Sequence, residues 1–254
     1  MSKMGLQLYS IKEEVEKDFL GTVAKAADMG YDGVQFAGFF DTPAEQVRDL
    51  LNEKGIEAAG AHIGIDQLRG DQLAETLEYN KTINNSLIIC PYIPEEMRQS
   101  GDDYRKLAEL LNEIGAACLQ EGFTFAYHNH AFEFEKYGDK TGFEILYKNT
   151  DPAYVKMELD CFWALYAGYD PNDIIQTYGD RVVSLHIKDI KKQGNENVST
   201  EIGNGHLDIE EIIKTSNDHL VKWFVIEQEH YEIDQMESTK MNADNLKKML
   251  VSAK

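Results

Sequence analysis

Residues 154–160, which read YVKMELD, decide the fold class. Their apolar members alternate with Lys156, Glu158 and Asp160. Successive side chains of a β-strand point to opposite faces, so this segment predicts a strand with one apolar face and one charged face. The apolar face is expected to pack against helices, and the charged face then points toward whatever the strands enclose.

Three further segments repeat this alternation: residues 123–128, 181–187 and 223–227. The inward-facing sets that the alternation predicts are Thr124, Ala126, His128 and His130; Ser184, His186 and Lys188; and Val225, Glu227 and Glu229. Their apolar neighbours, among them Val183 and Leu185, are predicted to face the helices. Imidazoles and carboxylates from four consecutive strands are therefore aimed at one axis.

Strand-like and helix-like segments alternate along the whole sequence. The eight predicted strands are residues 4–9, 32–36, 56–62, 86–90, 123–128, 154–160, 181–187 and 223–227. Successive strands begin about 30 residues apart, which is the length of one βα unit. Eight such units in 254 residues predict an α/β fold, a (β/α)8 TIM barrel.

The chain is predicted to form a single domain, residues 1–254. No linker or low-complexity stretch divides it, and it contains only 5 Pro. The longer connections follow strands, at residues 91–101, 131–140 and 191–207. In a (β/α)8 barrel those loops form the face on which ligands bind.

The composition restricts the partners. Lys and Arg number 25 and Asp and Glu 45, so the net charge is −20, which repels nucleic acids and anionic membranes. No apolar run reaches the roughly 20 residues that cross a bilayer, and no N-terminal signal segment is recognisable. The three cysteines form neither a disulfide framework nor a CxxC motif. We expect a cytoplasmic protein that acts on a small molecule, and the sequence leaves open whether identical chains assemble.

The converging polar residues predict a metal. A single His or Glu at a strand end is most often a solvated polar residue. Several buried carboxylates at one barrel mouth, however, are costly unless they are paired or bound to a cation. Mixed imidazole and carboxylate ligands suit Mn²⁺, Zn²⁺, Co²⁺ or Fe²⁺ better than Mg²⁺. We expect one divalent ion, with Mn²⁺ favoured.

Short motifs carry a family resemblance. They are LQLYS at 6–10, GYDGVQ at 30–35, AH at 61–62, YHNH at 127–130, FEF at 132–134, ELD at 158–160, LHIKD at 185–189, GNG at 203–205 and VIEQ at 225–228. In this order and spacing they resemble the xylose isomerase-like barrel superfamily, specifically the sugar phosphate isomerase/epimerase group that also contains inosose dehydratase and inosose isomerase. The resemblance covers essentially the whole chain.

The resemblance implies a set of metal ligands. In such families the metal is held by an acidic residue after the fifth strand, an Asp after the sixth, a His after the seventh and a Glu after the eighth. The last three correspond to Asp160, His186 and Glu227. At the fifth strand this chain has His where relatives often have Glu, so either His128 or Glu158 is the fourth ligand. His128 is favoured as the fourth ligand, because it stands at the fifth-strand position from which relatives supply a carboxylate.

Two other departures from the family pattern lie near the expected site. Gln35 stands at the end of the second strand, where relatives often carry Glu. Trp163 stands where many relatives have a substrate-contacting His. An aromatic ring can stack on the apolar face of a sugar, so the substrate contacts on that side are expected to differ. The resemblance implies a sugar, keto-sugar, sugar phosphate or cyclitol as substrate.

The implied activity is that of a metal-dependent isomerase or epimerase. A divalent ion on a carbonyl and its neighbouring hydroxyl acidifies the adjacent C–H by stabilising an enediolate. Glu158 and Glu227 are the candidate bases. The residues expected to bind or protonate substrate oxygens are His62, His130 and Lys188. Loss of a β-hydroxyl from the same intermediate gives the alternative, a dehydratase acting on an inosose or keto-sugar.

Other interpretations compete with this one. An apurinic endonuclease has a similar barrel but uses a larger metal cluster and a basic groove, against which the charge of −20 and only 7 histidines argue. A barrel that lost turnover with its fifth-strand carboxylate would bind without catalysis. Lys188 could have a structural role and only neutralise Asp189 or Asp160. Residues 203–205 could offer backbone amides to a substrate phosphate.

Overall fold

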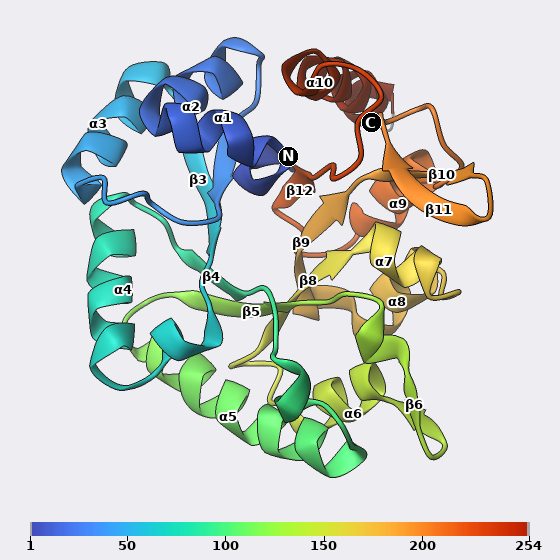
Figure 1. Cartoon of the computed structure of the whole chain (residues 1–254). Coiled ribbons are helices and arrows are strands. Elements are labelled where there is room, and N and C mark those ends of the chain that lie inside the picture. Colours follow the sequence, from blue (N-terminus) through green and yellow to red (C-terminus); the bar gives the residue numbers. More distant parts are fainter. Residues whose placement is uncertain (1, 253–254) are drawn as a thin grey trace.

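Eight parallel strands close into a barrel in the computed structural model, which describes residues 2–252 (Figure 1). Around the barrel they follow the order β1-β12-β9-β8-β5-β4-β3-β2. Their bounds are β1 (Lys3–Gln7), β2 (Gly33–Phe36), β3 (Glu57–His62), β4 (Leu87–Cys90), β5 (Thr124–His128), β8 (Lys156–Asp160), β9 (Val182–Ile187) and β12 (Trp223–Ile226). This is the predicted TIM barrel, with every predicted strand present.

Helices surround the strands and connect them (Figure 1). They are α1 (Lys12–Lys17), α2 (Phe19–Asp28), α3 (Ala44–Lys54), α4 (Gly70–Thr82), α5 (Gly101–Gln120), α6 (Gly142–Asn149), α7 (Cys161–Tyr166), α8 (Pro171–Tyr178), α9 (Ile209–Ser216) and α10 (Gln235–Ser252). Two small hairpins are inserted after strands: β6 (Lys136–Tyr137) with β7 (Lys140–Thr141), and β10 (Asp189–Gln193) with β11 (Glu196–Thr200). Among residues 2–252 no helix is long and apolar enough to cross a membrane. All three cysteines are buried free thiols.

One strand end differs from its prediction in a way that matters for the site. The first strand ends at Gln7 instead of Tyr9, because Leu8–Ile11 form a 3-10 turn. The Gln7 side chain caps this turn by accepting a hydrogen bond from the Tyr9 amide at 3.1 Å. The apolar alternation continues into the turn and therefore conceals it in the sequence. As a result, Gln7 stands fully buried at the end of β1.

The N-terminal half of the barrel interior is apolar. Trp223 packs there with Ala59 and Val225. A side chain on Gly33 would place its Cβ 2.7 Å from the Trp223 ring, so glycine makes room for the indole. A second interior cluster consists of Leu87, Ile89, Ala126 and Val183. The ionisable inward residues therefore stand on an apolar floor, toward the C-terminal ends of the strands.

The outward orientation predicted for Val183 is wrong. Val183 belongs to the interior apolar cluster, whereas Leu185 lies in the main core, as predicted. In its pairing with β8, strand β9 skips from Val182 to Ser184. An extra residue of this kind places two successive side chains on the same side of a strand. Strict alternation is broken there, and the sequence pattern contains no sign of the bulge.

Asp189 organises the long loop after β11. Its Oδ1 accepts the backbone N–H groups of Ile190 and Leu207 at 2.9 and 3.0 Å. Its Oδ2 accepts those of Gly203 and Gly205, both at 2.9 Å. Because an internal carboxylate already uses both glycine amides, the GNG segment is not the phosphate cradle that the sequence left open.

Asp189→Ala should destabilise the protein by about 3 kcal/mol, because a buried hydrogen-bonding group left without its partner costs roughly 1–3 kcal/mol. The matched control is Asp208→Ala, which removes the exposed cap of α9 and a single hydrogen bond to the Glu211 amide. Loss of such a cap costs about 1 kcal/mol. Urea denaturation followed by circular dichroism measures both changes. Equal losses in the two variants would contradict the organising role of Asp189.

Candidate metal and substrate site

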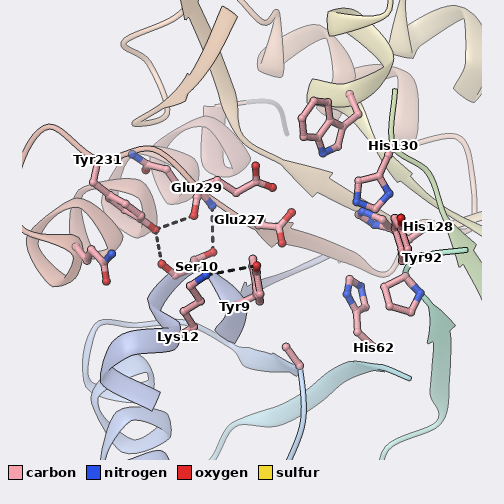
Figure 2. A pocket seen from close by; sticks show the side chains of 15 residues that line it. Tyr9, Ser10, Lys12, His62, Tyr92, His128, His130, Glu227, Glu229 and Tyr231 are labelled. Atoms are coloured by element: carbon pink, nitrogen blue, oxygen red, sulfur yellow. Dashed lines mark hydrogen bonds between the residues drawn. The ribbon is translucent and has the colours of Figure 1, made fainter. Parts of the chain in front are cut away.

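A cavity of about 560 Å³ opens at the C-terminal mouth of the barrel (Figure 2). Side chains at strand ends or just beyond them form its wall, among them Tyr9, His62, His128 and Glu227. The cavity is also lined by the loop residues Tyr92, His130 and Glu229 and by Trp163 of α7. The other site residues predicted from the sequence, Glu158, Asp160, His186 and Lys188, are buried next to this wall.

Four side chains, which we call the outer cluster, come together at the mouth: His128, Asp160, His186 and Glu227. All four are buried, and one potential ligand atom of each lies within 4.8 Å of the others. Asp160 Oδ2 is 3.8 Å from His128 Nε2, and Glu227 Oε2 is 3.2 Å from His186 Nδ1. The fold thus brings together the ligand set that includes His128.

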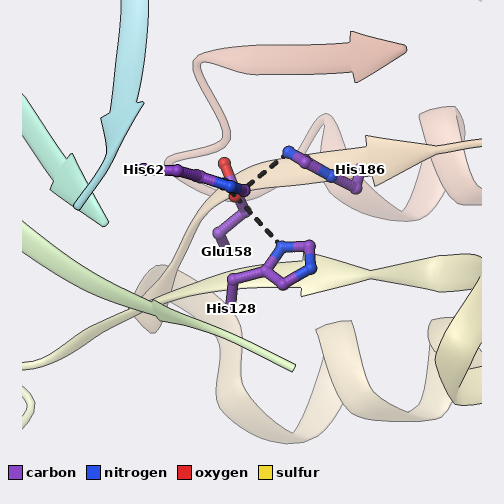
Figure 3. A group of neighbouring side chains, drawn as sticks. All are labelled: His62, His128, Glu158 and His186. Atoms are coloured by element: carbon purple, nitrogen blue, oxygen red, sulfur yellow. Dashed lines mark hydrogen bonds and ion pairs between the residues drawn. The ribbon is translucent and has the colours of Figure 1, made fainter. Parts of the chain in front are cut away.

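A second group, the inner cluster, consists of His62, His128, Glu158 and His186 (Figure 3). Glu158 Oε1 lies 2.7 Å from His62 Nε2. The same oxygen lies 3.2 Å from His128 Nδ1 and 3.1 Å from His186 Nε2. His128 and His186 belong to both clusters, and each of these rings turns one nitrogen toward each cluster.

Two uncharged side chains hold the other oxygen of Glu158. Gln35 Nε2 donates to Oε2 at 2.6 Å, and Ser184 Oγ donates to it at 2.8 Å. Glu158 itself is completely buried and is not part of the cavity wall. Its carboxylate therefore acts on the site through the imidazoles that contact it. Of the two candidate bases, Glu227 is the one on the wall.

Lys188 places a buried positive charge at the mouth. Its ammonium lies 3.0 Å from Asp160 Oδ2, 2.8 Å from Glu227 Oε2 and 2.9 Å from Glu229 Oε1. Of the two structural partners considered from the sequence, Asp160 is in contact with Lys188, whereas the Asp189 carboxylate binds loop amides. Three carboxylates therefore share one buried ammonium at this end of the barrel.

Burial and charge set the protonation of the outer cluster. Burial raises the pKa of Asp160 to about 6, although Lys188 opposes the rise. Burial also disfavours ionised Glu227, but Lys188 and His186 hold the pKa of this carboxyl well below its usual range. Against the effect of burial, Glu158 and Glu227 raise the pKa of His186 to about 10. Glu227 is thus an anion at neutral pH, the form that a ligand or a base needs.

In the inner cluster the charged carboxylate of Glu158 lies against the neutral imidazole of His128 and the imidazolium of His186. Burial, with His186 nearby, holds the pKa of His128 well below its usual value, so His128 is neutral and able to bind a metal. Burial disfavours the Glu158 anion, but His186 and His128 nevertheless hold the pKa of Glu158 well below its usual range. Burial and then Lys188 lower the pKa of His130 to about 4.

Aromatic rings form the outer part of the cavity. His130 stacks on Phe132 with an interplanar angle of 7°, and Tyr92 meets the His130 ring edge-on at a centroid distance of 6.1 Å. Trp163 Nε1 and His130 Nδ1 are buried without a hydrogen-bond partner among the described residues. Apolar ring faces beside unpaired polar nitrogens suit a sugar, which has both C–H faces and hydroxyls.

Several polar residues that support the site have no role assigned to them in the sequence analysis. Gln7 was hidden by the misplaced end of the first strand. Ser184 was placed inward, but nothing in the sequence connects it to Glu158. Glu133 is buried, accepts hydrogen bonds from the Tyr127 hydroxyl at 2.5 Å and the His130 amide at 2.8 Å, and so holds the loop that carries His130. Burial raises the pKa of Glu133 to about 8.

The outer cluster fits the divalent ion expected from the sequence. Two imidazoles and two carboxylates form a donor set typical of Mn²⁺, Zn²⁺, Co²⁺ and Fe²⁺. Asp160 Oδ2 is buried, and beside its ion pair with Lys188 it accepts no hydrogen bond within the described part of the chain. It therefore retains lone pairs that a metal could use. His128, Asp160, His186 and Glu227 would hold the ion.

The closed barrel and the His/carboxylate cluster at its C-terminal mouth define the class of this protein as a (β/α)8 barrel with a candidate metal centre. Residues 23–249 match the model of the xylose isomerase-like TIM barrel family. The chain belongs to this family, which confirms the resemblance found in its motifs.

The individual relatives are identical to this chain at about a quarter of the aligned residues or fewer. The inosose dehydratase of Geobacillus kaustophilus is 26% identical over 200 residues, which cover 70% of this chain and 64% of the relative's length. A sugar phosphate isomerase/epimerase from Parabacteroides distasonis superposes with a TM-score of 0.81 at 25% identity, covering 97% of this chain and 98% of that one. The IolI protein, solved with a bound zinc atom, shares the fold, with a TM-score of 0.76 at 12% identity.

The purified chain should bind about one divalent ion, and His186→Ala should weaken that binding by at least about 100-fold, because even residues behind the ligands contribute 10–100-fold. Isothermal titration with Mn²⁺ and Zn²⁺, together with metal analysis after dialysis, measures both quantities. The control is His219→Ala, which changes a histidine that lines a separate cavity with Lys3 and Trp223, the first residues of β1 and β12. Full occupancy in the His186 variant would refute the outer cluster as the site.

Metal binding should also release protons. Between pH 7 and pH 9 we expect release of about one proton, because an imidazolium with a pKa of about 10 must become neutral to bind through His186. Below pH 6 a second proton should come from Asp160, whose pKa is about 6, so the apparent affinity should fall more steeply there. Titrations in buffers of different ionisation enthalpy count these protons. Binding without proton release at pH 8 would contradict the raised pKa of His186.

Proposed function

We propose that the protein removes a proton next to the carbonyl of a keto-sugar or keto-cyclitol and then expels a β-hydroxyl, so that the net reaction is loss of water. The observation that carries the proposal is a cavity lined by a carboxylate, Glu227, and an imidazole, His62, beside the outer cluster. Strands β12 and β3 are not neighbours in the barrel, so the two groups approach the cavity from different sides. The relatives named inosose dehydratase support this reaction class.

Glu227 is the proposed proton acceptor. Its Oε2 accepts a hydrogen bond from Lys188 Nζ at 2.8 Å and lies 3.2 Å from His186 Nδ1. The carboxylate is anchored through this one oxygen, and the side chain borders the cavity. Oε1 is then the atom that takes the proton from the substrate carbon. Lys188, which is buried behind the wall, keeps Glu227 ionised and in place.

His62 is the proposed proton donor. Its Nε2 lies 2.7 Å from Glu158 Oε1, and its ring borders the cavity. A buried carboxylate on one imidazole nitrogen orients the ring, as Asp does for the His of a catalytic triad. His62 Nδ1 then gives its proton to the departing hydroxyl, which leaves as water. In this scheme Glu158 serves the reaction through His62 and does not touch the substrate.

The remaining groups bind and polarise the substrate. His130 and Trp163 present ring faces and polar nitrogens to the outer half of the cavity, where they hold the carbon skeleton and its hydroxyls. A divalent ion in the outer cluster would polarise the substrate carbonyl and thereby make the neighbouring C–H more acidic. The substrate thus loses a proton to Glu227 and a hydroxyl that leaves as water with the proton from His62. Glu227 then gives its proton to solvent and His62 takes one up, so the net change is the loss of one water molecule.

Isomerisation or epimerisation is the second candidate. It is favoured by the Parabacteroides distasonis protein named sugar phosphate isomerase/epimerase, which matches nearly the whole chain at 25% identity. The reaction would begin with the same proton transfer to Glu227. The proton would then return to the opposite face or to the adjacent carbon, and no water would be lost.

Incubation with keto-inositols and keto-hexoses in D₂O with Mn²⁺ should give loss of water from one of them, detected by mass spectrometry. Glu227→Gln should lower both this loss and α-deuterium exchange by about 100-fold, the usual scale for a missing acid or base. His62→Gln should lower the loss of water to a similar extent but preserve α-exchange, because proton removal precedes departure of the hydroxyl.

His219→Ala serves as the control in this assay, and the metal content of every variant is measured alongside turnover. A product that has lost no water, and differs from the substrate in mass only by any deuterium taken up at carbon, would assign the isomerase instead of the dehydratase. Full turnover in both the Glu227 and the His62 variants would refute the proposed roles.

A further inference from the structure

A chain of hydrogen bonds links the first strand of the barrel to the inner cluster. Gln7 Oε1 accepts from the Tyr9 backbone N–H at 3.1 Å. Gln7 Nε2 donates to Gln35 Oε1 at 2.6 Å, and Gln35 Nε2 donates to Glu158 Oε2 at 2.6 Å. Both glutamine side chains are completely buried. This series of hydrogen bonds therefore runs through the protein interior, from the Tyr9 backbone amide to the Glu158 carboxylate.

The two ends of this series of hydrogen bonds determine which atom of each amide donates and which accepts. A backbone N–H only donates hydrogen bonds, and an ionised carboxylate only accepts them. Each amide between these ends must turn its oxygen toward Tyr9 and its nitrogen toward Glu158. The oxygen and nitrogen of a glutamine are otherwise assigned from such networks, and here the network allows one orientation. Gln35 Oε1 is thus fixed as an acceptor.

This orientation determines the state of His186. Its Nε2 lies 2.7 Å from Gln35 Oε1 and 3.1 Å from Glu158 Oε1. Both oxygens are acceptors, so Nε2 carries a hydrogen. A ring nitrogen that carries a hydrogen has no lone pair for a metal. The nitrogen that a metal can use is Nδ1, which faces Glu227 in the outer cluster.

His128 is oriented in the complementary way. Its Nδ1 lies 3.2 Å from Glu158 Oε1, and its Nε2 lies 3.8 Å from Asp160 Oδ2. The carboxylate that accepts Nδ1–H leaves Nε2 free to bind on the opposite side. A metal in the outer cluster would thus be bound by His128 Nε2 and His186 Nδ1, whereas a metal in the inner cluster would need the opposite nitrogen of each ring.

We propose that Gln35 is a positioning residue, which through Gln7 and Glu158 directs a metal ion to the outer cluster and keeps the inner cluster from binding it. This inference rests on the proposed metal site. A glutamate at position 35 could not donate to Glu158 and would place a second carboxylate about 2.6 Å from it. The inner cluster would then contain two carboxylates and three imidazoles and would compete for the cation.

The test uses ¹¹³Cd²⁺ as the probe metal, because its nuclear spin couples to each ¹⁵N nucleus that binds it. In ¹⁵N-labelled protein we expect coupling to His186 Nδ1 and His128 Nε2. Coupling to His186 Nε2, His128 Nδ1 or His62 would overturn the inference while leaving metal binding intact. Failure to bind cadmium, Mn²⁺ or Zn²⁺ would overturn the metal site itself, so the two failures are distinguishable.

Gln35→Glu should move the cadmium couplings to the inner-cluster nitrogens or change cadmium affinity by at least 10-fold, the scale of groups that orient metal ligands. Asn80→Asp is the matched control, a buried amide-to-carboxylate change in α4, where Asn80 bonds to Thr76 and Asn85. It should keep both the coupling pattern and the affinity. If Gln35→Glu does not fold, Gln7→Leu removes the upstream amide and should give the Gln35 amide a second orientation. Unchanged couplings and affinity in the folded Gln35 or Gln7 variant would refute the positioning role.

Discussion

The completely buried carboxylate of Glu158 determines the arrangement of the barrel mouth. A charge in that position is costly unless every lone pair is satisfied, and here Gln35, Ser184 and three imidazole nitrogens provide the partners. These partners come from β2, β3, β5 and β9, so one charge fixes the side chains of four other strands relative to one another. The apolar layers below it exclude alternative polar partners. The imidazoles at the mouth are consequently held on two sides, by their own strands and by this carboxylate.

The site separates orientation from binding. In the inner cluster the Glu158 carboxylate is saturated by the side chains around it and does not itself reach the cavity. The outer cluster borders the cavity, and Glu227 and Asp160 share the Lys188 ammonium there instead of a full set of neutral donors. Groups held this loosely can exchange partners for a ligand. A rigid inner layer beneath an exchangeable outer layer is the arrangement that precise chemistry requires of a site on a strand scaffold.

The barrel and the inward residues were predictable because they depend on local patterns. Alternation in residues 154–160 was enough to place Glu158 and Asp160 on the interior side, and the number of βα units indicated the closed sheet. The failures came where pairing between strands overrides alternation. Val183 turns inward at a bulge that only the register with β8 creates, and Gln7 ends a strand whose apolar pattern continues into a turn. The same limitation applies to the site, because no pattern along the chain shows that Gln35 and Glu158, 123 positions apart, are hydrogen-bonded.

Charge and hydrogen-bond direction lead to the same location for a cation. In the outer layer the three carboxylates of Asp160, Glu227 and Glu229 face two positive charges, the Lys188 ammonium and the His186 imidazolium, so negative charge is in excess. In the inner layer a single carboxylate already faces three imidazoles and two uncharged donors. An added cation therefore gains more electrostatic energy in the outer layer, where unsatisfied negative charge is concentrated in a low-dielectric environment. Hydrogen-bond direction imposes the same choice independently, since the nitrogens of His128 and His186 that face Glu158 are the ones that donate.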